Sequence, residues 1–289
     1  MAPPPAARPT SIRLFLADGT PDGFRMVEKS GWTGLGLVAA RSDYPIARKR
    51  EEWSRPGVYL LTGPPEGDGL RDRLYVGESD DVRNRMVGHV KEKDFWTAVI
   101  AFTSKDSSLN KAHVRYLEAR LLQLAAEADR VDLDNTTAPA LPPMSEADRA
   151  DAEGFLQELM PILPLLGIRA LERVSQSGPA ADRLFLKGPD AEAAAADTAD
   201  GFVVFEGSMA RATAAPSMHA FLAALRGNLT AEGVLMTVGN QLRFTKPWIF
   251  NSPSTAAGVV LGRAANGRTE WRDADGITLK QRQERAVDA

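Results

Sequence analysis

Two short strand-like segments, joined by a turn and followed directly by a helix, constrain this chain more than any other feature. Residues 57–61 and 73–77 are rich in apolar and aromatic side chains, and the Pro- and Gly-rich stretch 63–69 separates them. This pattern predicts a β-hairpin. Ser79 is a favourable N-cap with an acidic first turn after it, so we expect the hairpin to lead directly into a helix.

This hairpin and helix carry more polar side chains than packing requires. Tyr59 and Tyr75 lie in the two strands, while Arg85 and His89 are four residues apart and so share one helix face. Taken singly, the tyrosines are ordinary strand residues and the Arg and His an ordinary exposed helix face. Their joint order predicts a functional cluster at the edge of the core.

The surrounding segments predict a mixed α and β fold. Residues 11–40 contain an alternating run and two Asp-Gly pairs, which favour a β-hairpin and a third strand. Residues 95–104 form an apolar, β-rich run that predicts a buried strand. Ser107 or Ser108 is then expected to cap the clearest helix of the chain, which continues to Ala128.

One carboxylate in that long helix has an unexpected position. Val114, Leu117, Leu121 and Leu124 pave the buried face, and Glu118 lies between apolar neighbours at helical spacing. Alone, it would be a salt-bridge partner for Arg115 or Arg120.

Length and composition limit the classes of protein. The 289 residues suit two domains, and a helix is broken near Pro161. Residues 175–200 then combine one short strand, RLFLK, with an alanine-rich, acidic stretch expected to be a flexible join or a helix. With no cysteine, disulfides, zinc-thiolate sites and thiol catalysis are excluded. No segment reaches the about 20 apolar residues of a membrane span, so no membrane partner is expected and a cytoplasmic location is predicted.

The net charge of −3 conceals an uneven distribution. Residues 121–200 hold 6 Lys and Arg against 15 Asp and Glu, whereas residues 41–120 hold 15 against 13. The slightly basic regions on either side of the acidic one permit contact with a polyanion without requiring it.

The site residues, in order, resemble a known nuclease family. Gly57-Val58-Tyr59 and Tyr75-Val76-Gly77 resemble the two half-motifs of the GIY-YIG nucleases, with valine in place of isoleucine in each. The family also has a serine or threonine after the second motif, an Arg and a His four apart, a Glu in a Tyr-Leu-Glu context and a downstream Asn. The matching positions are Ser79, Arg85, His89, Glu118 and Asn135. The resemblance covers roughly residues 55–140.

This resemblance implies an α/β (α+β) fold in which a small antiparallel three-stranded sheet is flanked by helices, preceded by an N-terminal β extension. It also implies a metal-dependent endonuclease that hydrolyses phosphodiester bonds in DNA by a one-metal mechanism. Glu118 would hold the metal ion, Mg²⁺ or Mn²⁺, and Arg85 would stabilise charge on the phosphate.

The other matched residues receive roles by the same resemblance. Tyr59 is the general base, Tyr75 orients water or phosphate, and His89 relays a proton or holds the Tyr59 hydroxyl. Ser79 and Asn135 belong to the substrate-binding set. His113 and His219 have no matched partner and are expected on helix surfaces.

The C-terminal region has a resemblance of its own. SPSTAAGVVLG and NGRTEW are similar to a domain of uncharacterised function, DUF4357, and to modules associated with DNA modification enzymes. Arg268 stands where a large apolar residue is expected. The predicted domains are therefore an N-terminal β-rich extension at 1–50, a nuclease domain with a trailing helix at 51–175 and an α+β module at 200–289.

Two alternatives remain open at the level of sequence. The chain is also compatible with a catalytically inactive DNA-binding or adaptor protein on the same scaffold, and with a nuclease that acts on RNA. The sequence leaves the oligomeric state open.

Overall fold

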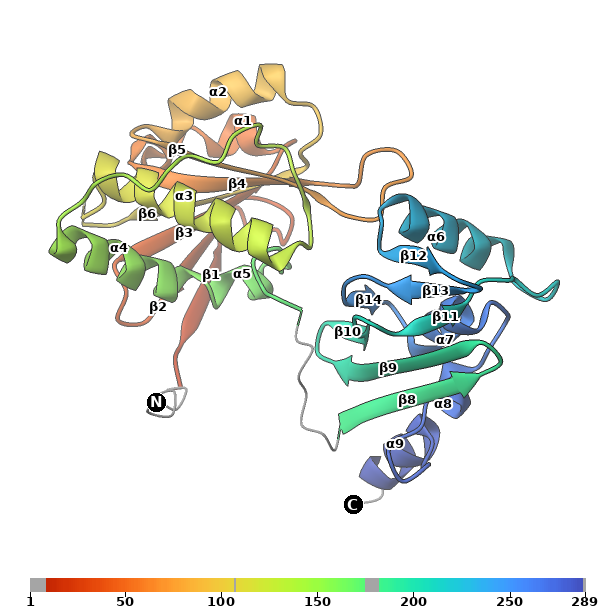
Figure 1. The fold of residues 1–289 in the computed structure, drawn as a ribbon. Helices are drawn as coiled ribbons and strands as arrows, with labels where there is room; N and C mark the ends of the chain where they lie inside the picture. The colour runs from red at the N-terminus through yellow and green to blue at the C-terminus, as the bar shows by residue number, and fades with distance from the viewer. Residues whose placement is uncertain (1–8, 107, 175–181, 288–289) are drawn as a thin grey trace. The chain divides into compact units, whose positions relative to one another are not determined.

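Two sheets, each with helices packed against it, make up the part of the chain that the computed structural model describes, residues 9–106, 108–174 and 182–287 (Figure 1). The chain divides into two compact units, Met1–Arg173 and Val174–Ala289. The predicted α+β class is confirmed. Within the described ranges, no helix has the length and apolar character needed to cross a membrane.

The first unit is built on a seven-stranded sheet in the order β1-β2-β3-β6-β4-β5-β7. Its neighbouring strands are antiparallel except β5 and β7, which run parallel. The strands are β1 (Ile12–Leu16), β2 (Arg25–Lys29), β3 (Gly34–Ala40), β4 (Gly57–Gly63), β5 (Arg73–Ser79), β6 (Ala98–Ser104) and β7 (Asp132–Leu133).

The three strands predicted at the centre form the block β6-β4-β5, and the N-terminal extension continues the same sheet. β3 pairs with β6 over its whole length, from Gly34 opposite Ser104 to Ala40 opposite Ala98. Six of the seven residues of β3 are buried, so this strand needs a neighbour on each edge and cover on each face. Strands β1–β3 therefore share a hydrophobic core with the hairpin.

Helices cover both faces of this sheet. One face carries α1 (Tyr44–Ala47), a 3-10 turn (Glu51–Ser54) and α2 (Val82–Glu92), with Trp53, Tyr59 and Met86 in its core. The other face carries α3 (Lys111–Ala128), α4 (Glu146–Leu159) and α5 (Ile162–Leu165), with Phe102, Leu117 and Phe155 in its core. The two layers are visible in Figure 1 on either side of the strands.

The helix caps differ from those predicted from the sequence. The cap of α2 is Asp81, whose side chain accepts a hydrogen bond from the Asn84 amide at 2.9 Å, while Ser79 is still the last residue of β5. The cap of α3 is Asn110, not Ser108, and Ser107 lies outside the described residues. In both cases the predicted N-cap is the first suitable side chain before the helix. Strand pairing and the length of the loop place the start of the helix further along the chain.

His113 is buried, so its predicted place on a helix surface is wrong. It occupies the third position of α3, where its ring accepts a hydrogen bond from the Asn110 amide at 3.4 Å and completes a capping box. Helix α4 packs beside this turn, and its residue Asp148 lies 3.7 Å from His113 Nε2. His219, by contrast, is exposed at the start of α6, as predicted.

The second unit contains a sheet in the order β12-β13-β11-β9-β10-β14, with β8 paired to β9. Its strands are β8 (Arg183–Gly188), β9 (Ala191–Thr198), β10 (Gly201–Val204), β11 (Met209–Arg211), β12 (Leu235–Val238), β13 (Gln241–Phe244) and β14 (Trp248–Phe250). Its helices are α6 (Ala220–Ala231), α7 (Pro253–Leu261), α8 (Gly267–Glu270) and α9 (Leu279–Val287).

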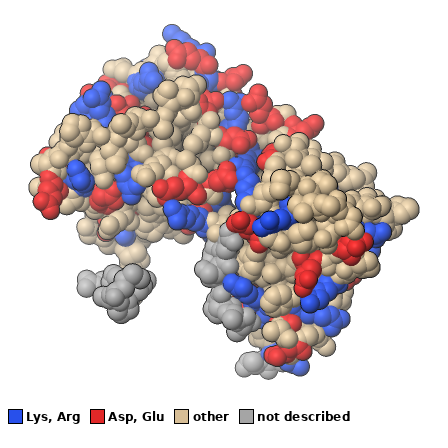
Figure 2. Space-filling view, in the orientation of Figure 1, with Lys and Arg blue, Asp and Glu red and all other residues tan. Residues whose placement is uncertain are grey.

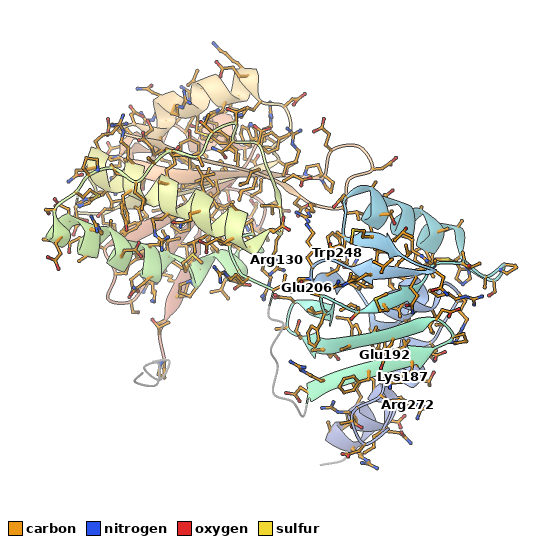
Figure 3. The ribbon with its side chains drawn as sticks, viewed as in Figure 1. Arg130, Lys187, Glu192, Glu206, Trp248 and Arg272 are labelled. Carbon is orange, nitrogen blue, oxygen red and sulfur yellow. The ribbon has the colours of Figure 1, made fainter. Side chains whose placement is uncertain are left out.

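The alanine-rich stretch predicted as a join or a helix is a strand. β9 pairs with β8 along six positions and with β10 along four, and its buried alanines face the core. Lys187 and Glu192 are opposite each other in this pairing and form an ion pair at 3.0 Å (Figure 3). Pairing on both edges outweighs the helix propensity of alanine here.

The segment around Trp271 is a short helix followed by irregular chain. Asn266 caps the short helix α8, and Arg272 then forms only isolated bridges with Phe185 and Thr278. Trp271 is fully buried and its indole donates to the carbonyl of Pro253 at 3.0 Å, so it is a packing aromatic.

Candidate functional site

A pocket of about 390 Å³ in the first unit collects most of the residues predicted for the site. It lies against the outer edge of β5, between the helices of the two layers. Its lining consists of Tyr75, Arg85, His89, Glu92, Lys93, Glu118, Asp134, Asn135, Thr136, Thr137 and Pro139.

The alternation of β5 explains how residues from both layers reach one place. Tyr75 belongs to the layer of α2, whereas Leu74 and Val76 belong to the layer of α3. β7 pairs only with Arg73 and Leu74, so it leaves the remaining length of this edge of β5 uncovered by a strand. Helix α2 therefore supplies Arg85 and His89 from one side of the edge, and α3 supplies Glu118 from the other.

Tyr59 is placed by the glycine opposite it. Tyr59 and Gly77 are partners in the β4–β5 pairing, and a Cβ at Gly77 would stand only 2.4 Å from the Tyr59 hydroxyl oxygen and 2.5 Å from its ring carbon. The phenol thus lies across the glycine toward α2. Gly57 has a similar requirement, because a Cβ there would stand 2.6 Å from the carbonyl oxygen of Phe102. Both motif positions therefore require glycine, because a neighbouring residue of the core lies too close to leave room for a Cβ atom.

The Tyr59 hydroxyl shares a hydrogen bond with His89 Nε2 at 2.7 Å. Burial lowers the pKa of His89 to about 4, and the positive charges of Arg85 and Lys93 act in the same direction. Burial also raises the pKa of Tyr59 well above its usual range. At neutral pH a neutral imidazole therefore faces a protonated phenol, whose O–H can be donated to Nε2.

Arg85 connects these groups to the pocket. Its guanidinium interacts with the hydroxyl groups of Tyr59 and Tyr75, and these interactions raise the pKa of Arg85. The residue is exposed, so its charge is accessible to an anion in the pocket. A guanidinium in this position suits bidentate contact with a phosphate.

Glu118 lies half-buried in the pocket wall without a hydrogen-bond or ion-pair partner among the residues that the structure describes. Burial raises the pKa of Glu118 to about 6 and the negative charge of Glu78 adds to this shift, whereas the positive charges of Lys111, Arg85 and Arg115 oppose it. The two arginines that the sequence offered as partners are bound elsewhere. Arg120 pairs with Glu153 at 2.7 Å, and Arg115 lies 3.9 Å from Glu78. The Glu118 carboxylate is therefore available to a ligand.

Asn135 acts as a substitute for a paired strand. Its side-chain oxygen accepts a hydrogen bond from the Val76 amide at 2.9 Å, and its side-chain nitrogen donates to the Val76 carbonyl at 2.8 Å. Both ends of the amide are thus engaged by the backbone of β5, and the residue fixes the loop that forms one wall of the pocket. Ser79 is bound locally, to the amide and carbonyl of Asp81, and does not line the pocket.

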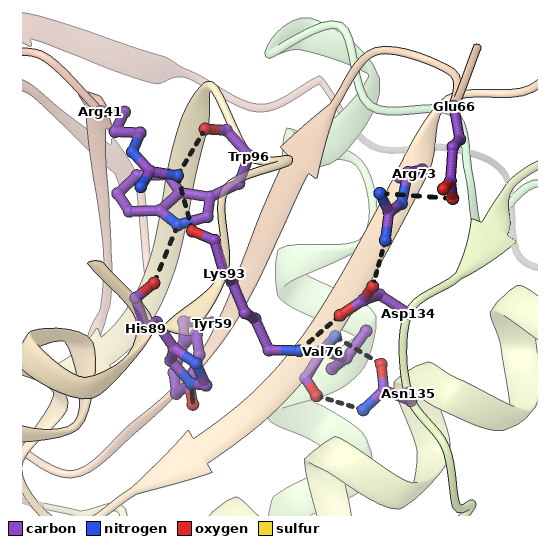
Figure 4. A network of polar contacts seen from close by, with 10 residues as sticks. All are labelled: Arg41, Tyr59, Glu66, Arg73, Val76, His89, Lys93, Trp96, Asp134 and Asn135. Carbon is purple, nitrogen blue, oxygen red and sulfur yellow. Dashed lines mark hydrogen bonds and ion pairs between the residues drawn. The ribbon is translucent and has the colours of Figure 1, made fainter. Parts of the chain in front are cut away.

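A charged network closes the wall next to Asn135 (Figure 4). Asp134 pairs with Lys93 and with Arg73, and Arg73 also lies 3.5 Å from Glu66. Lys93 Nζ lies 4.3 Å from the centre of the Tyr75 ring, a cation–π contact. Although burial opposes it, hydrogen bonding from Lys93 and Arg73 lowers the pKa of Asp134.

The N-terminal extension fixes the end of α2. Arg41, which follows β3, donates from Nη1 to the Lys93 carbonyl at 2.7 Å (Figure 4). Its Nη2 donates to the Val90 carbonyl at 3.1 Å. Its guanidinium also lies 4.7 Å from the centre of the Trp96 ring. These contacts satisfy carbonyls at the C-terminal end of the helix that carries Arg85 and His89.

The structure brings five of the seven predicted residues to the pocket wall, namely Tyr75, Arg85, His89, Glu118 and Asn135. Tyr59 is fully buried behind them and reaches them through His89 and Arg85. Sequence reasoning missed Lys93 and Asp134. The available signals were the four-residue spacing of His89 and Lys93 and the position of Asp134 directly before Asn135.

The donor set of the pocket suits one hard cation. Within the described ranges, no group of three or more His, Asp or Glu side chains is arranged to hold a metal ion. A single free carboxylate such as Glu118, with water and a substrate phosphate as the other ligands, matches the way proteins bind Mg²⁺.

The face of the first unit seen in Figure 2 carries Lys and Arg interspersed with Asp and Glu.

Comparison with known proteins identifies one domain. Residues 184–283 match the family model described as domain of unknown function (DUF4357), so the sequence-based prediction of this domain is confirmed, with a start earlier than residue 200. No GIY-YIG family model matches the chain. No curated protein matches the chain, and no solved structure matches it.

Proposed function

We propose that the first unit is a metal-dependent endonuclease of the GIY-YIG type that hydrolyses phosphodiester bonds in DNA. The observation that carries this proposal is the free carboxylate of Glu118, which shares one pocket with the guanidinium of Arg85 and with Tyr75 and His89. An anionic substrate and a cation that bridges it to a carboxylate both find complementary groups there.

Each side chain has a task that follows from its chemistry. Arg85 forks onto the phosphate oxygens and stabilises the charge that grows on them as water attacks phosphorus. Tyr75 lies in the pocket wall with Lys93 over its ring, and its hydroxyl orients the phosphate or the water. Asn135 and Asp134 hold the wall in place through Val76 and Lys93.

Tyr59 is the general base in this proposal, with His89 behind it. When Arg85 moves from Tyr59 to the phosphate, the phenol oxygen becomes accessible. The water then gives its proton to Tyr59, whose own proton passes to His89 Nε2 along the 2.7 Å hydrogen bond. The water oxygen forms a bond to phosphorus while the bond to the leaving oxygen breaks, and solvent supplies the proton of that oxygen.

A Mg²⁺ or Mn²⁺ ion held by Glu118 would polarise the phosphate and stabilise the leaving oxygen. The chain contributes to this site a carboxylate fixed on the rigid helix α3, in a partly buried place where electrostatic interactions are stronger than in water.

Cleavage assays test this proposal. Purified full-length protein is incubated with supercoiled, linear, single-stranded and branched DNA and with RNA, each with Mg²⁺, with Mn²⁺ or with EDTA. We expect DNA cleavage that requires the metal ion and that falls about 10²- to 10³-fold in Arg85→Ala. Glu118→Gln is expected to lose metal-dependent cleavage. Lys91→Ala, which removes an exposed cation of α2 outside the pocket, is the matched control and should retain kcat.

Two further variants assign the tyrosines. We expect Tyr59→Phe to lose about 10²- to 10⁴-fold in kcat, the range typical of a general base, and Tyr75→Phe to lose less. The opposite order would transfer the role of base to Tyr75. Binding of DNA without cleavage under every metal condition would refute the enzyme and favour a binding protein, whereas cleavage confined to RNA would refute the choice of substrate.

A further inference from the structure

Glu78, which immediately follows the second motif, occupies a position that the proposed mechanism does not use. It is the penultimate residue of β5, and the alternation of the strand places it with Leu74 and Val76 on the face covered by α3. Only 14% of its side chain is exposed. A carboxylate so placed among apolar strand positions needs partners.

Its partners are two cations of α3. Glu78 Oε2 accepts a hydrogen bond from Lys111 Nζ at 2.8 Å, and Glu78 Oε1 lies 3.9 Å from Arg115 Nε. Lys111 also lies 3.4 Å from Asp80. Each oxygen of Glu78 therefore faces one cation.

These cations belong to the same helix face as the proposed metal ligand. Arg115 precedes Glu118 by three residues and Lys111 precedes it by seven, so all three side chains lie along one side of α3. An Arg three residues from a Glu is a common intrahelical ion-pair partner. In the part of the chain that the structure describes, however, Glu118 has no ion pair.

We propose that Glu78 is a positioning residue that holds Lys111 and Arg115 away from the Glu118 carboxylate, and so keeps this carboxylate free for a divalent cation. The inference rests on the proposed function, because it concerns the same metal site. If Glu78 is neutralised, Arg115 loses its partner in β5 and Lys111 keeps only its contact with Asp80, and the nearest free carboxylate on their helix is Glu118. The ion pair that forms then competes with the metal ion.

Mn²⁺ binding to the full-length protein, measured by the EPR signal of the free ion, tests this inference without any cleavage. Glu78→Gln should weaken Mn²⁺ binding about ten- to hundredfold, the usual effect of changing a group behind a metal ligand. Adding Lys111→Met and Arg115→Met to Glu78→Gln should restore most of the affinity, because the competing cations are gone.

A matched control exists on the same helix. Glu153→Gln removes the partner of Arg120, which is held at 2.7 Å on the side of α3 that faces α4. This variant neutralises a carboxylate and releases an arginine, as Glu78→Gln does, but away from the pocket. Its Mn²⁺ affinity should equal that of the wild type.

The outcomes separate this inference from the function it rests on. Wild-type protein with no Mn²⁺ binding beyond that of Glu118→Gln would overturn both. Unchanged Mn²⁺ affinity in Glu78→Gln would overturn the inference alone. So would a triple variant whose Mn²⁺ affinity is as low as that of Glu78→Gln, because that result would make Glu78 itself a metal ligand. Should Glu78→Gln fail to fold, Lys111→Met with Arg115→Met replaces it, and weakened Mn²⁺ binding in that variant would contradict the inference.

Discussion

Replacing Gly77 with alanine perturbs the centre of the site by a single methyl group. The added Cβ would stand 2.4 Å from the hydroxyl oxygen of Tyr59 and 2.5 Å from its ring carbon, distances that real Cβ atoms do not show. Tyr59 is fully buried and cannot yield into solvent. The phenol must therefore swing away from α2, and the 2.7 Å hydrogen bond to His89 breaks.

The cost in the free energy of unfolding combines three contributions. Overpacking of a well-filled core costs about 1–3 kcal/mol, and loss of the Tyr59–His89 hydrogen bond adds about 1 kcal/mol. Replacing glycine by alanine in a strand returns about 0.5–1 kcal/mol of backbone entropy. The net destabilisation is about 2 kcal/mol, which lowers the Tm of a unit of this size by about 4–8 °C.

Differential scanning calorimetry of the full-length protein measures this change, because the transition that moves belongs to the first unit. Gly88→Ala is the matched control. It makes the same substitution inside α2, where the nearest atoms to the new Cβ are the Glu92 carboxylate oxygens at 3.9 Å. Since alanine is the better helix former by about 1 kcal/mol, this control should raise the Tm.

An unchanged or higher Tm in Gly77→Ala would refute this argument. It would mean that the phenol has another place in the core that it can occupy without loss, and that the glycine of the second motif is not there for Tyr59.

The remaining predictions concern the groups around the pocket. In the absence of metal, folding raises the pKa of Glu118 from 4.5 to about 6, so the charged carboxylate destabilises the fold progressively as pH rises through this window. Glu118→Gln should therefore be more stable by about 1 kcal/mol at pH 7, since solvent screens this half-buried carboxylate, and no more stable at pH 4 in urea titrations, and an equal gain at both pH values would contradict the shift. Asn135→Ala leaves the buried amide and carbonyl of Val76 unpaired and should cost about 2–4 kcal/mol in the same titrations, whereas Asn135→Asp should cost less because it still accepts from the amide. Arg41→Met removes the cap at the end of α2 and should speed hydrogen exchange in its last turn but not in α3, and equal exchange in wild type and variant would show that the cap is dispensable.

Much of the fold around the site follows from local pattern. The hairpin of β4 and β5, the strand β6 and the long helix α3 are predicted from their apolar runs and turn residues, because these patterns depend on side chains that are close in sequence. The positions of the caps were less predictable. Several favourable side chains precede each helix, and the length of the loop decides which of them is used.

The strand β9 shows where local propensity fails. Its alanines favour a helix in isolation, but β8 and β10 offer hydrogen-bonding partners on both edges, and small side chains fit the buried face of that sheet. The hydrophobic periodicity of the sequence does not show which strands will lie beside β9, so it cannot predict that this segment is a strand.

For the candidate site, the sequence by itself determined which chemical groups are present and on which elements they lie. Tyr59, Arg85 and Glu118 are identified by order and spacing, and the motif glycines by their place in the strands. Only the tertiary structure decided that the edge of β5 joins the two helical layers at one pocket, and that Tyr59 lies behind its wall.

The tertiary structure also decided that Glu118 is free. The sequence places Arg115 three residues before Glu118, at the spacing of an intrahelical ion pair, and Arg120 two residues after it, on a different side of the helix. Nothing local distinguishes a paired carboxylate from a free one. The choice depends on Glu78 in β5 and Glu153 in α4, which bind the competing cations across the core. Ion pairing is set by distances between elements, and these distances exist only once the chain has folded.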